Sequence, residues 1–255
     1  MHCGELCDRL DELLDTGAYA DLDASANGLQ VGRRDREVDR VAVAVDAAAA
    51  TVEAAREASA DLLLTHHGLV WDGLERVTGR DYDRVASLVE GDVGLYVSHL
   101  PLDGHQDLGN AAGVGDVLGL TEREPFGTMG PEYIGQRGRL AEPAAVGDLR
   151  EQLAAELDTG GQGVQVLDFG PETVEDVAIV TGSGVDWLEE AIEAGADALV
   201  TGEGKQFAYH EAREAGIHVV LAGHYATETF GVRALADRLE EWGLETTFVD
   251  HPTGL

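Results

Sequence analysis

Two segments of the chain, Val41–His67 and Val177–Glu203, align with each other without a gap over 27 positions, of which about ten are identical. Both segments predict a strand, a turn, an alanine-rich helix and a second strand, and both end on the pattern Ala-Asp-x-Leu-x-Thr. Apolar residues on one face of each helix and acids on the other are typical of a helix that packs on a sheet. Such a repeat constrains the fold strongly, because each copy is one supersecondary unit.

A third apolar strand follows each copy. It lies in "GLYVSHLPLD" (Gly94–Asp103) in the first half and in "IHVVLAGHYATE" (Ile217–Glu228) in the second, and each contains a histidine with a carboxylate four residues later. Strands that alternate with helices predict an α/β fold, so we expect two similar α/β halves from an internal duplication. The halves are predicted to span residues 1–125 and 126–255, with a short connecting section near residues 121–172.

The composition is strongly acidic, with 49 acidic residues against 17 basic ones and a formal net charge of −32. The acids are spread over helix-like stretches such as "LREQLAAELD" rather than gathered in a tail, which indicates a surface adapted to its solvent. Such self-repulsion is tolerated at high salt, because the Debye length falls to about 3 Å at 1 M. We therefore interpret the chain as halophilic; a dedicated binder of cations or basic proteins is the alternative. The same surface argues against binding nucleic acid through its phosphates.

Cys3 and Cys7 are the only cysteines, so the chain has no disulfide framework. If the N-terminus is helical, the two residues share one face, and they are expected either to pack in the core or simply to be tolerated there. No apolar run reaches 18 residues, and the first residues lack the layout of a signal peptide. The sequence therefore predicts a soluble, cytoplasmic protein that does not enter a membrane.

The stretch "LLLTHHGLVW" (Leu62–Trp71) offers the first candidate metal ligands. His66 and His67 end a predicted buried strand, and Gly68 turns the chain. Adjacent strand residues point to opposite faces, but at the end of a strand both rings can turn into one cleft. Neutral imidazole is a common ligand of transition metals. The alternative is that one histidine packs in the core while the other faces solvent.

The next candidates lie in "SHLPLD". Asp103 is expected on a loop just past the strand, because Pro101 ends the strand, and it is either a ligand or a turn former. His99 is expected either to orient a ligand or to be a buried histidine of the core.

The last candidates lie in "AGHYATE". Gly223 allows a tight turn from strand to helix, and His224 and Glu228 then lie one helical turn apart, a spacing that suits a shared metal ion. The alternative is that Glu228 only favours the N-terminus of a helix.

Taken together, three histidines and two carboxylates lie just past predicted strand ends in corresponding places of two repeated halves. Five such ligands exceed the four that one zinc ion needs, and they suit two divalent ions such as zinc, manganese, iron or cobalt. A bound ion lowers the pKa of water towards neutrality and supplies hydroxide for attack on a phosphate or a carbonyl. The candidate ligands are His66, His67, Asp103, His224 and Glu228.

These motifs, together with "GNAAG", "TGEGK", "NGLQVG" and "VAVAVDA", resemble the Nif-three-like family of dinuclear metal-centre proteins, and the resemblance covers nearly the whole chain. Members of this family are often described as GTP cyclohydrolase type 2 homologues. The resemblance implies the Nif-three-like fold of two intertwined α/β halves, without the large central insertion that some members carry. It also implies that the five candidate residues bind the metal pair, and that the chain forms a ring-shaped homohexamer with the metal sites facing its interior.

The function that the resemblance implies is a metal-dependent hydrolase of a small nucleotide or phosphoester, similar to GTP cyclohydrolase type 2. A hydroxide that bridges the two ions would be the nucleophile, and Glu228 and His99 are the residues expected to take part in catalysis. The alternative is a non-enzymatic metal-binding ring that acts as a scaffold or a regulatory partner. Turnover of a nucleotide by the metal-loaded protein would distinguish the two.

Three further polar residues lie near these motifs. The stretch "TGEGKQ" is not a Walker loop, because Leu199 stands where the first glycine would fall and no Ser or Thr follows Lys205. Glu203 and Lys205 are expected either to line the cleft, with Lys205 against a substrate phosphate, or to form an ordinary strand-to-helix turn. His210 is expected either near the site or on the surface of a helix.

Overall fold

The two segments that resemble each other in sequence form the same parallel strand pair, each in its own sheet. In the computed structural model, which describes residues 1–255, Val41 lies opposite Leu62 in one sheet, and Val177 lies opposite Ala198 in the other. These are corresponding positions of the two copies, so the copies share one register. The predicted α/β fold is confirmed.

The chain divides into two compact units. Unit 1 comprises residues 1–102 and 231–251, and unit 2 comprises residues 103–230 and 252–255. These units do not coincide with the predicted halves, 1–125 and 126–255, for two reasons. Residues 120–129 pair with the second sheet, and the last strand of the chain, residues 245–248, pairs with the first.

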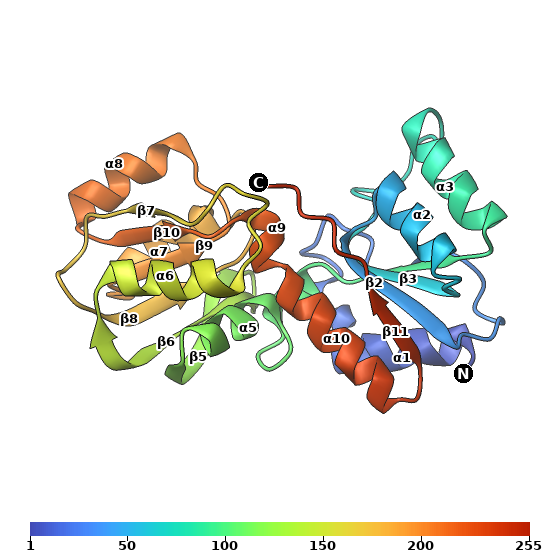
Figure 1. The fold of residues 1–255 in the computed structure, drawn as a ribbon, viewed down its shortest axis with the longest axis horizontal. Helices are drawn as coiled ribbons and strands as arrows, with labels where there is room; N and C mark the ends of the chain where they lie inside the picture. The colour runs from blue at the N-terminus through green and yellow to red at the C-terminus, as the bar shows by residue number, and fades with distance from the viewer. The chain divides into compact units, whose positions relative to one another are not determined.

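Unit 1 holds a five-stranded sheet in the order β1-β4-β3-β2-β11 (Figure 1). The strands are β1 (Gly28–Val31), β2 (Arg40–Asp46), β3 (Leu62–His67), β4 (Gly94–Val97) and β11 (Glu245–Phe248). The sheet is parallel except for β1, which pairs antiparallel with β4 at one edge. The helices of unit 1 are α1 (Cys3–Leu13), the 3₁₀ helix η1 (Thr16–Tyr19), α2 (Ala49–Glu57) and α3 (Arg80–Glu90). Two further helices, α4 (Leu100–Gly104) and α10 (Thr229–Glu241), contain the points at which the chain passes from one unit to the other.

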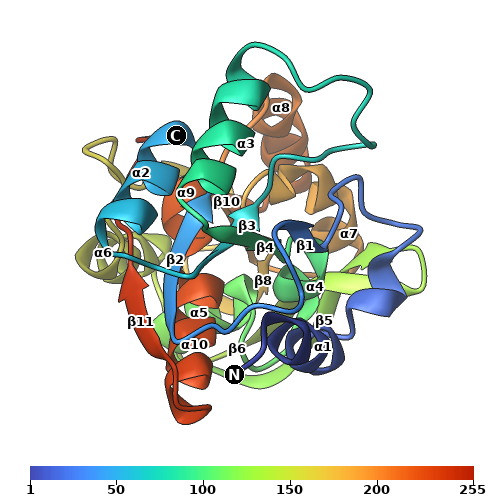
Figure 2. The same ribbon diagram turned by 90° about the vertical axis from the view of Figure 1, so that its right-hand side faces the viewer.

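Helices cover both faces of this sheet, which is why its central strands are apolar along most of their length. On one face, Ala42 of β2 packs in a cluster with Val52 of α2 and Leu88 of α3. α1 and α10 lie on the opposite side of the sheet from α2 and α3 (Figure 2). Cys3 and Cys7 on α1 are fully buried, and their sulfur atoms lie 3.9 Å apart, so the expected packing role of the two cysteines is confirmed.

Unit 2 holds a six-stranded sheet in the order β5-β6-β8-β9-β10-β7. The strands are β5 (Leu120–Met129), β6 (Glu132–Ala144), β7 (Gln165–Leu167), β8 (Val174–Ile179), β9 (Ala198–Thr201) and β10 (His218–Leu221). Only β8, β9 and β10 are parallel to one another. The helices are α5 (Asn110–Val117), α6 (Val146–Glu156), the 3₁₀ helix η2 (Gly184–Trp187), α7 (Leu188–Glu193), α8 (Gln206–Ala215) and α9 (His224–Thr227).

The prediction that residues 121–172 form a short connecting section is wrong, because much of this stretch belongs to the sheet of unit 2. β5 and β6 form a long antiparallel hairpin, and Gly130 turns the chain between them with a φ of +62°. Half of the residues of β5 are exposed, so the strand lacks the apolar run that would have identified it. Helices α5 and α6 pack against this sheet through Val114, Leu149 and Leu153. None of the helices in the chain is long and apolar enough to cross a lipid bilayer.

Candidate metal centre

His66 and His67 lie at the carboxyl end of β3, in the middle of the sheet of unit 1. His66 is fully buried, whereas the His67 side chain is about a fifth exposed. Their ring centroids are only 4.6 Å apart, with the ring planes tilted by 47°. The two neighbouring rings therefore converge at the strand end instead of pointing to opposite faces.

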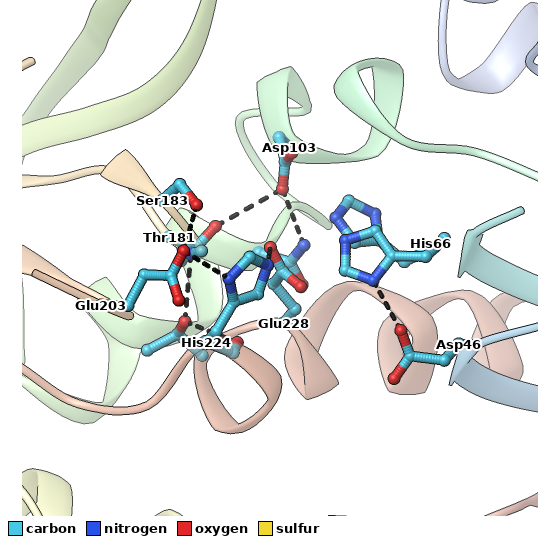
Figure 3. A network of polar contacts seen from close by, with 12 residues as sticks. Asp46, His66, Asp103, Thr181, Ser183, Glu203, His224 and Glu228 are labelled. Atoms are coloured by element: carbon cyan, nitrogen blue, oxygen red, sulfur yellow. Dashed lines mark hydrogen bonds and ion pairs between the residues drawn. The ribbon is translucent and has the colours of Figure 1, made fainter. Parts of the chain in front are cut away.

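Each ring is held by an oxygen atom on its Nδ1 side. His66 Nδ1 lies 3.0 Å from the backbone carbonyl oxygen of Ser98, and His67 Nδ1 lies 2.8 Å from Asp46 Oδ1 (Figure 3). Because both oxygens only accept hydrogen bonds, Nδ1 carries the proton in each neutral ring and Nε2 carries the lone pair. A carboxylate or carbonyl behind a histidine in this way is the usual support of a metal-binding imidazole.

His99 brings a third imidazole to the same place. It follows β4, and its ring centroid lies 5.0 Å from that of His66 and 5.7 Å from that of His67. Ring nitrogens of the three histidines lie within 4.8 Å of one another, which is close enough for one metal ion to contact all three. Trp71 packs edge-on against His99 with the ring centroids 5.0 Å apart.

Asp23 positions His99. Its Oδ1 lies 2.8 Å from His99 Nδ1, and the backbone N–H of His99 donates to Asn27 Oδ1 at 2.7 Å. Burial of Asp23 alone would raise its pKa, but the hydrogen bond and charge of His99, followed by hydrogen bonds from Asn27 and the N–H of Ser25, hold that pKa below its usual range. Asp23 is therefore a carboxylate that stays charged in a nearly buried place, and His99 has a fixed orientation.

Unit 2 carries a histidine and a carboxylate one helical turn apart. Gly223, with a φ of +94°, makes the turn from β10 into α9, which begins at His224. His224 Nε2 lies 3.2 Å from Glu228 Oε1, and His224 Nδ1 lies 3.4 Å from Glu203 Oε1 (Figure 3). Glu203 in turn accepts a hydrogen bond from the Ser183 hydroxyl. His224 and Glu228 are thus in contact, but Glu228 ends α9 as its C-cap residue with a φ of −101° and does not continue the single helix that the sequence had predicted.

The two carboxylates change the acidity of His224. Burial alone would lower the pKa of His224, but the hydrogen bond and charge of Glu228, followed by the charge of Glu203, raise it to about 9. The negative potential that holds this proton is the potential that a divalent cation would also experience. The donor set of unit 2 is therefore suited to a cation.

Asp103 is nearly buried in α4, not on a loop as predicted from Pro101. Proline is tolerated in the first turn of a helix, because the N–H that it lacks would have no partner there, and this is why the strand end continues into a helix. Asn110 Nδ2 donates to Asp103 Oδ1 at 2.8 Å, and the Thr181 hydroxyl lies 3.4 Å from the same oxygen (Figure 3). The carboxylate is thus oriented by two polar side chains of its own unit.

Gly182 makes the room for Glu228. It follows β8 with a φ of +57°, and a Cβ atom at this position would lie 2.2 Å from Glu228 Oε1 and 3.1 Å from His224 Nε2. No other residue type fits this position without moving the two candidate ligands.

The three remaining polar residues near the sequence motifs lie at or after the end of β9. Glu203 contacts His224, as described above, and Lys205 lies at the N-terminus of α8 with its Nζ 2.5 Å from Asp186 Oδ2. His210 is exposed on α8, which is the second of the two places considered for it.

Sequence reasoning missed the side chains that position the histidines and Asp103. The residues concerned are Asp23, Asp46, Asn27, Asn110 and Thr181. Three of them lie in motifs that the resemblance includes, namely "NGLQVG", "VAVAVDA" and "GNAAG". A polar residue inside an otherwise apolar or glycine-rich motif was the available signal.

The fold and these side chains define a class: a two-sheet α/β protein in which imidazole and carboxylate groups gather at strand ends. Residues 1–253 match the family model described as Duf34/NIF3 (NGG1p interacting factor 3). The chain belongs to this family, and the resemblance found in the sequence is confirmed.

Relatives and solved structures agree with this assignment. A protein of Halobacterium salinarum named "GTP cyclohydrolase 1 type 2 homolog" is 59% identical over 255 residues, which cover 100% of both chains. The crystal structure of TTHA1606 from Thermus thermophilus has a TM-score of 0.90 at 38% identity and also covers 100% of both chains. A protein named ybgI, described as of unknown function, gives the same TM-score and coverage at 35% identity.

Proposed function

We propose that the chain binds two divalent metal ions and hydrolyses a small nucleotide or phosphoester, as a GTP cyclohydrolase type 2-like enzyme. The observation that carries the proposal is a group of three imidazoles in unit 1, each with Nδ1 against an oxygen acceptor and with ring nitrogens within 4.8 Å of one another. His66 and His67 are the proposed ligands, and His99 lies beside them with Nε2 left to transfer a proton. Histidines that only pack in a core do not require an oxygen acceptor at each Nδ1, whereas metal-binding imidazoles usually have one.

The donor set fits the proposed ions. Nitrogen ligands from His66 and His67 in unit 1, and mixed ligands from Asp103, His224 and Glu228 in unit 2, suit zinc, manganese, iron or cobalt. The raised pKa of His224 supports a cation at the donors of unit 2. Five ligands are more than one tetrahedral ion uses, which supports a pair of ions.

The ions would supply Lewis acidity and a water of lowered pKa when they are bound. The other tasks fall to the chain. His99 can accept a proton at Nε2 from water or return it to a leaving group, because Asp23 holds Nδ1–H and stabilises the charged imidazole. Glu228, which is nearly buried, would hold an ion and keep His224 in place through their contact. Both residues are therefore proposed to take part in catalysis.

The setting that we propose is a cytoplasm of high salt. The dispersed net charge of −32 and the 59% identity with a protein of Halobacterium salinarum support this setting. The name of that relative supports a nucleotide as substrate. The ring-shaped homohexamer stays a prediction from the family.

Elemental analysis combined with a turnover assay tests the proposal. The protein is purified in molar salt, its metal content is measured, and release of phosphate and opening of the guanine ring are followed with GTP. We expect about two ions per chain and turnover that Glu228→Gln abolishes, whereas Glu214→Gln, an exposed change on α8, leaves turnover unaltered. Stoichiometric metal without turnover of GTP or any other nucleotide or phosphoester would favour the non-enzymatic ring, and absence of metal would contradict both functions.

A further inference from the structure

Unit 2 contains a cavity of about 430 Å³ that is lined by none of the candidate metal ligands. Residues of the turn between β9 and α8 form one wall, and residues of β7 and β10 form another. The side chains that matter for its chemistry are Gln165, Leu167, Lys205, Gln206, Tyr209 and Leu221. We call it the Lys205 cavity. Its volume is in the range of cavities that hold small organic ligands, about 300–1,000 Å³.

The Lys205 cavity reaches the candidate ligands of the same unit. Glu203 lines it and lies 3.4 Å from His224 Nδ1 through Oε1. Gly223, which precedes His224 in the chain, lines it as well. A molecule in the cavity is therefore placed beside the side chains that the proposed function uses.

Lys205 is the only lysine in the sequence, and all other Lys or Arg positions are arginine. No arginine lines the cavity. A lysine ammonium is a compact charge with three rotatable donors, and lysine is a common phosphate-binding residue. Its Nζ lies 2.5 Å from Asp186 Oδ2, so a ligand anion would exchange with, or be shared with, that carboxylate. The protein has a net charge of −32 and repels anions in general, but the ammonium group of Lys205 attracts an anion locally.

The other side chains suit a flat ring with polar edges. Tyr209 packs edge-on against Phe169 with the ring centroids 5.1 Å apart, and its side chain remains exposed enough to contact a ligand. Leu167 and Leu221 supply apolar surface, and Gln165 pairs with Leu221 across the β7–β10 ladder. Amide side chains both donate and accept hydrogen bonds, which is what recognition of a nucleobase edge requires.

We infer that the Lys205 cavity binds a nucleotide, with its phosphate group on Lys205 and its base between Tyr209 and the leucines. This inference deepens the proposed function, on which it rests, by naming the side chains that would hold its substrate. Binding in this place does not require the metal ligands, so it can be measured without metal.

The test is calorimetric titration of the metal-free protein. The buffer contains a chelator and a salt concentration at which the protein is folded. The probes are GTP, guanosine and inorganic triphosphate. We expect GTP to bind more tightly than either part alone. Lys205→Met should weaken GTP binding by about tenfold or more, as when a hydrogen bond to a charged group is lost, and should leave guanosine binding unchanged. Lys205→Arg should retain part of the affinity.

Further variants separate the base from the phosphate. Tyr209→Ala should weaken GTP and guanosine equally and leave triphosphate unaffected, and Asp186→Asn should tighten GTP binding by releasing Lys205. Arg213→Met removes an exposed cation from the last turn of the same helix and is the matched control. Circular dichroism verifies that each variant is folded.

Two outcomes would overturn the inference. One is that the folded, metal-free protein binds none of the probes at millimolar concentration. The other is that Lys205→Met binds GTP as tightly as the unaltered protein. Failure of the proposed function is a different result: GTP binds with the expected variant effects, but the metal-loaded protein never turns it over. Conversely, turnover whose kcat/KM is the same in Lys205→Met contradicts the cavity and not the hydrolase.

Discussion

Asp61 of unit 1 and Asp197 of unit 2 occupy corresponding positions and make the same hydrogen bonds. Oδ2 of each aspartate accepts two backbone N–H groups near the start of the preceding parallel strand, at 2.8–3.0 Å. The donors are Asp39 and Arg40 in unit 1 and Glu175 and Asp176 in unit 2. The amino ends of the two sheets are therefore built alike in detail.

The carboxyl ends of the same strands differ. Asp46 of β2, which supports His67, corresponds to Gly182, which has no side chain and leaves room for Glu228. His67 itself corresponds to Glu203. The register is set by the backbone ladder, which in unit 1 includes the pair Asp46 and His67, so the side chains at these positions can change without altering it. The same strand–helix–strand unit therefore carries two different sets of metal-donor side chains.

The largest effect is expected from His67→Ala. Asp46→Asn changes only the carboxylate that supports His67, and we expect it to lower metal affinity by about 10–100-fold. His67→Ala removes the ligand itself and should therefore lower metal affinity by more. Equilibrium dialysis with zinc or cobalt measures both variants, and His210→Ala, on the exposed face of α8, is the control. Unchanged affinity in His67→Ala would show that unit 1 holds no metal donors.

Gly182→Ala should destabilise the metal-free protein by about 2–4 kcal/mol, because the new Cβ meets Glu228 Oε1 and the backbone has a positive φ. Gly195→Ala is the matched control: its φ is +74°, but nothing lies within 4 Å of the new atom, so about 1 kcal/mol is expected. Chemical denaturation measures the two. Equal losses would mean that Gly182 is present for its backbone alone.

Asp61→Ala and Asp197→Ala test the shared frame. Each should cost about 1–3 kcal/mol of unfolding free energy, since two N–H groups lose a charged acceptor. Asp61 also pairs with Arg36 at 3.2 Å, so its loss should be somewhat larger. Denaturation and metal analysis together decide the outcome: a large difference between the two, or loss of metal in either, argues against a common structural role. Asp237→Ala, an exposed change on α10, serves as control.

The smallest effect concerns the corresponding residues Thr65 and Thr201. The Thr201 hydroxyl donates to the Gly182 carbonyl at 3.3 Å, whereas the buried Thr65 hydroxyl has no hydrogen-bond partner. Thr201→Val should therefore cost about 1 kcal/mol, and Thr65→Val should be neutral or stabilising. Thermal or chemical denaturation under identical salt provides the comparison, and a reversed order would contradict it.

Much of the fold could be predicted, because the repeat is local in sequence. The strand–helix–strand copies, the histidine pair at a strand end and the contact of His224 with Glu228 were all readable from short stretches. The hairpin β5–β6 and the return of β11 to the first sheet were not, because exposed strands lack an apolar signal and pairing partners are distant in the chain.

The carboxylates that hold the histidines of the candidate site could not be predicted from the sequence either. Asp46 is 21 residues from His67, and Asp23 is 76 residues from His99. A chain with 49 acidic residues offers no way to choose these two from composition or spacing.

The sequence by itself determined the duplicated strand–helix–strand unit, the family and the types of side chain at the strand ends. These depend on periodicity and on residues that are neighbours in the chain. Only the tertiary structure decided that His99 joins His66 and His67, which carboxylate supports which imidazole, and that Lys205 lines a cavity beside His224. The physical reason is that strand order and register bring distant residues to one edge of a sheet, and a hydrogen bond forms only between groups placed there together.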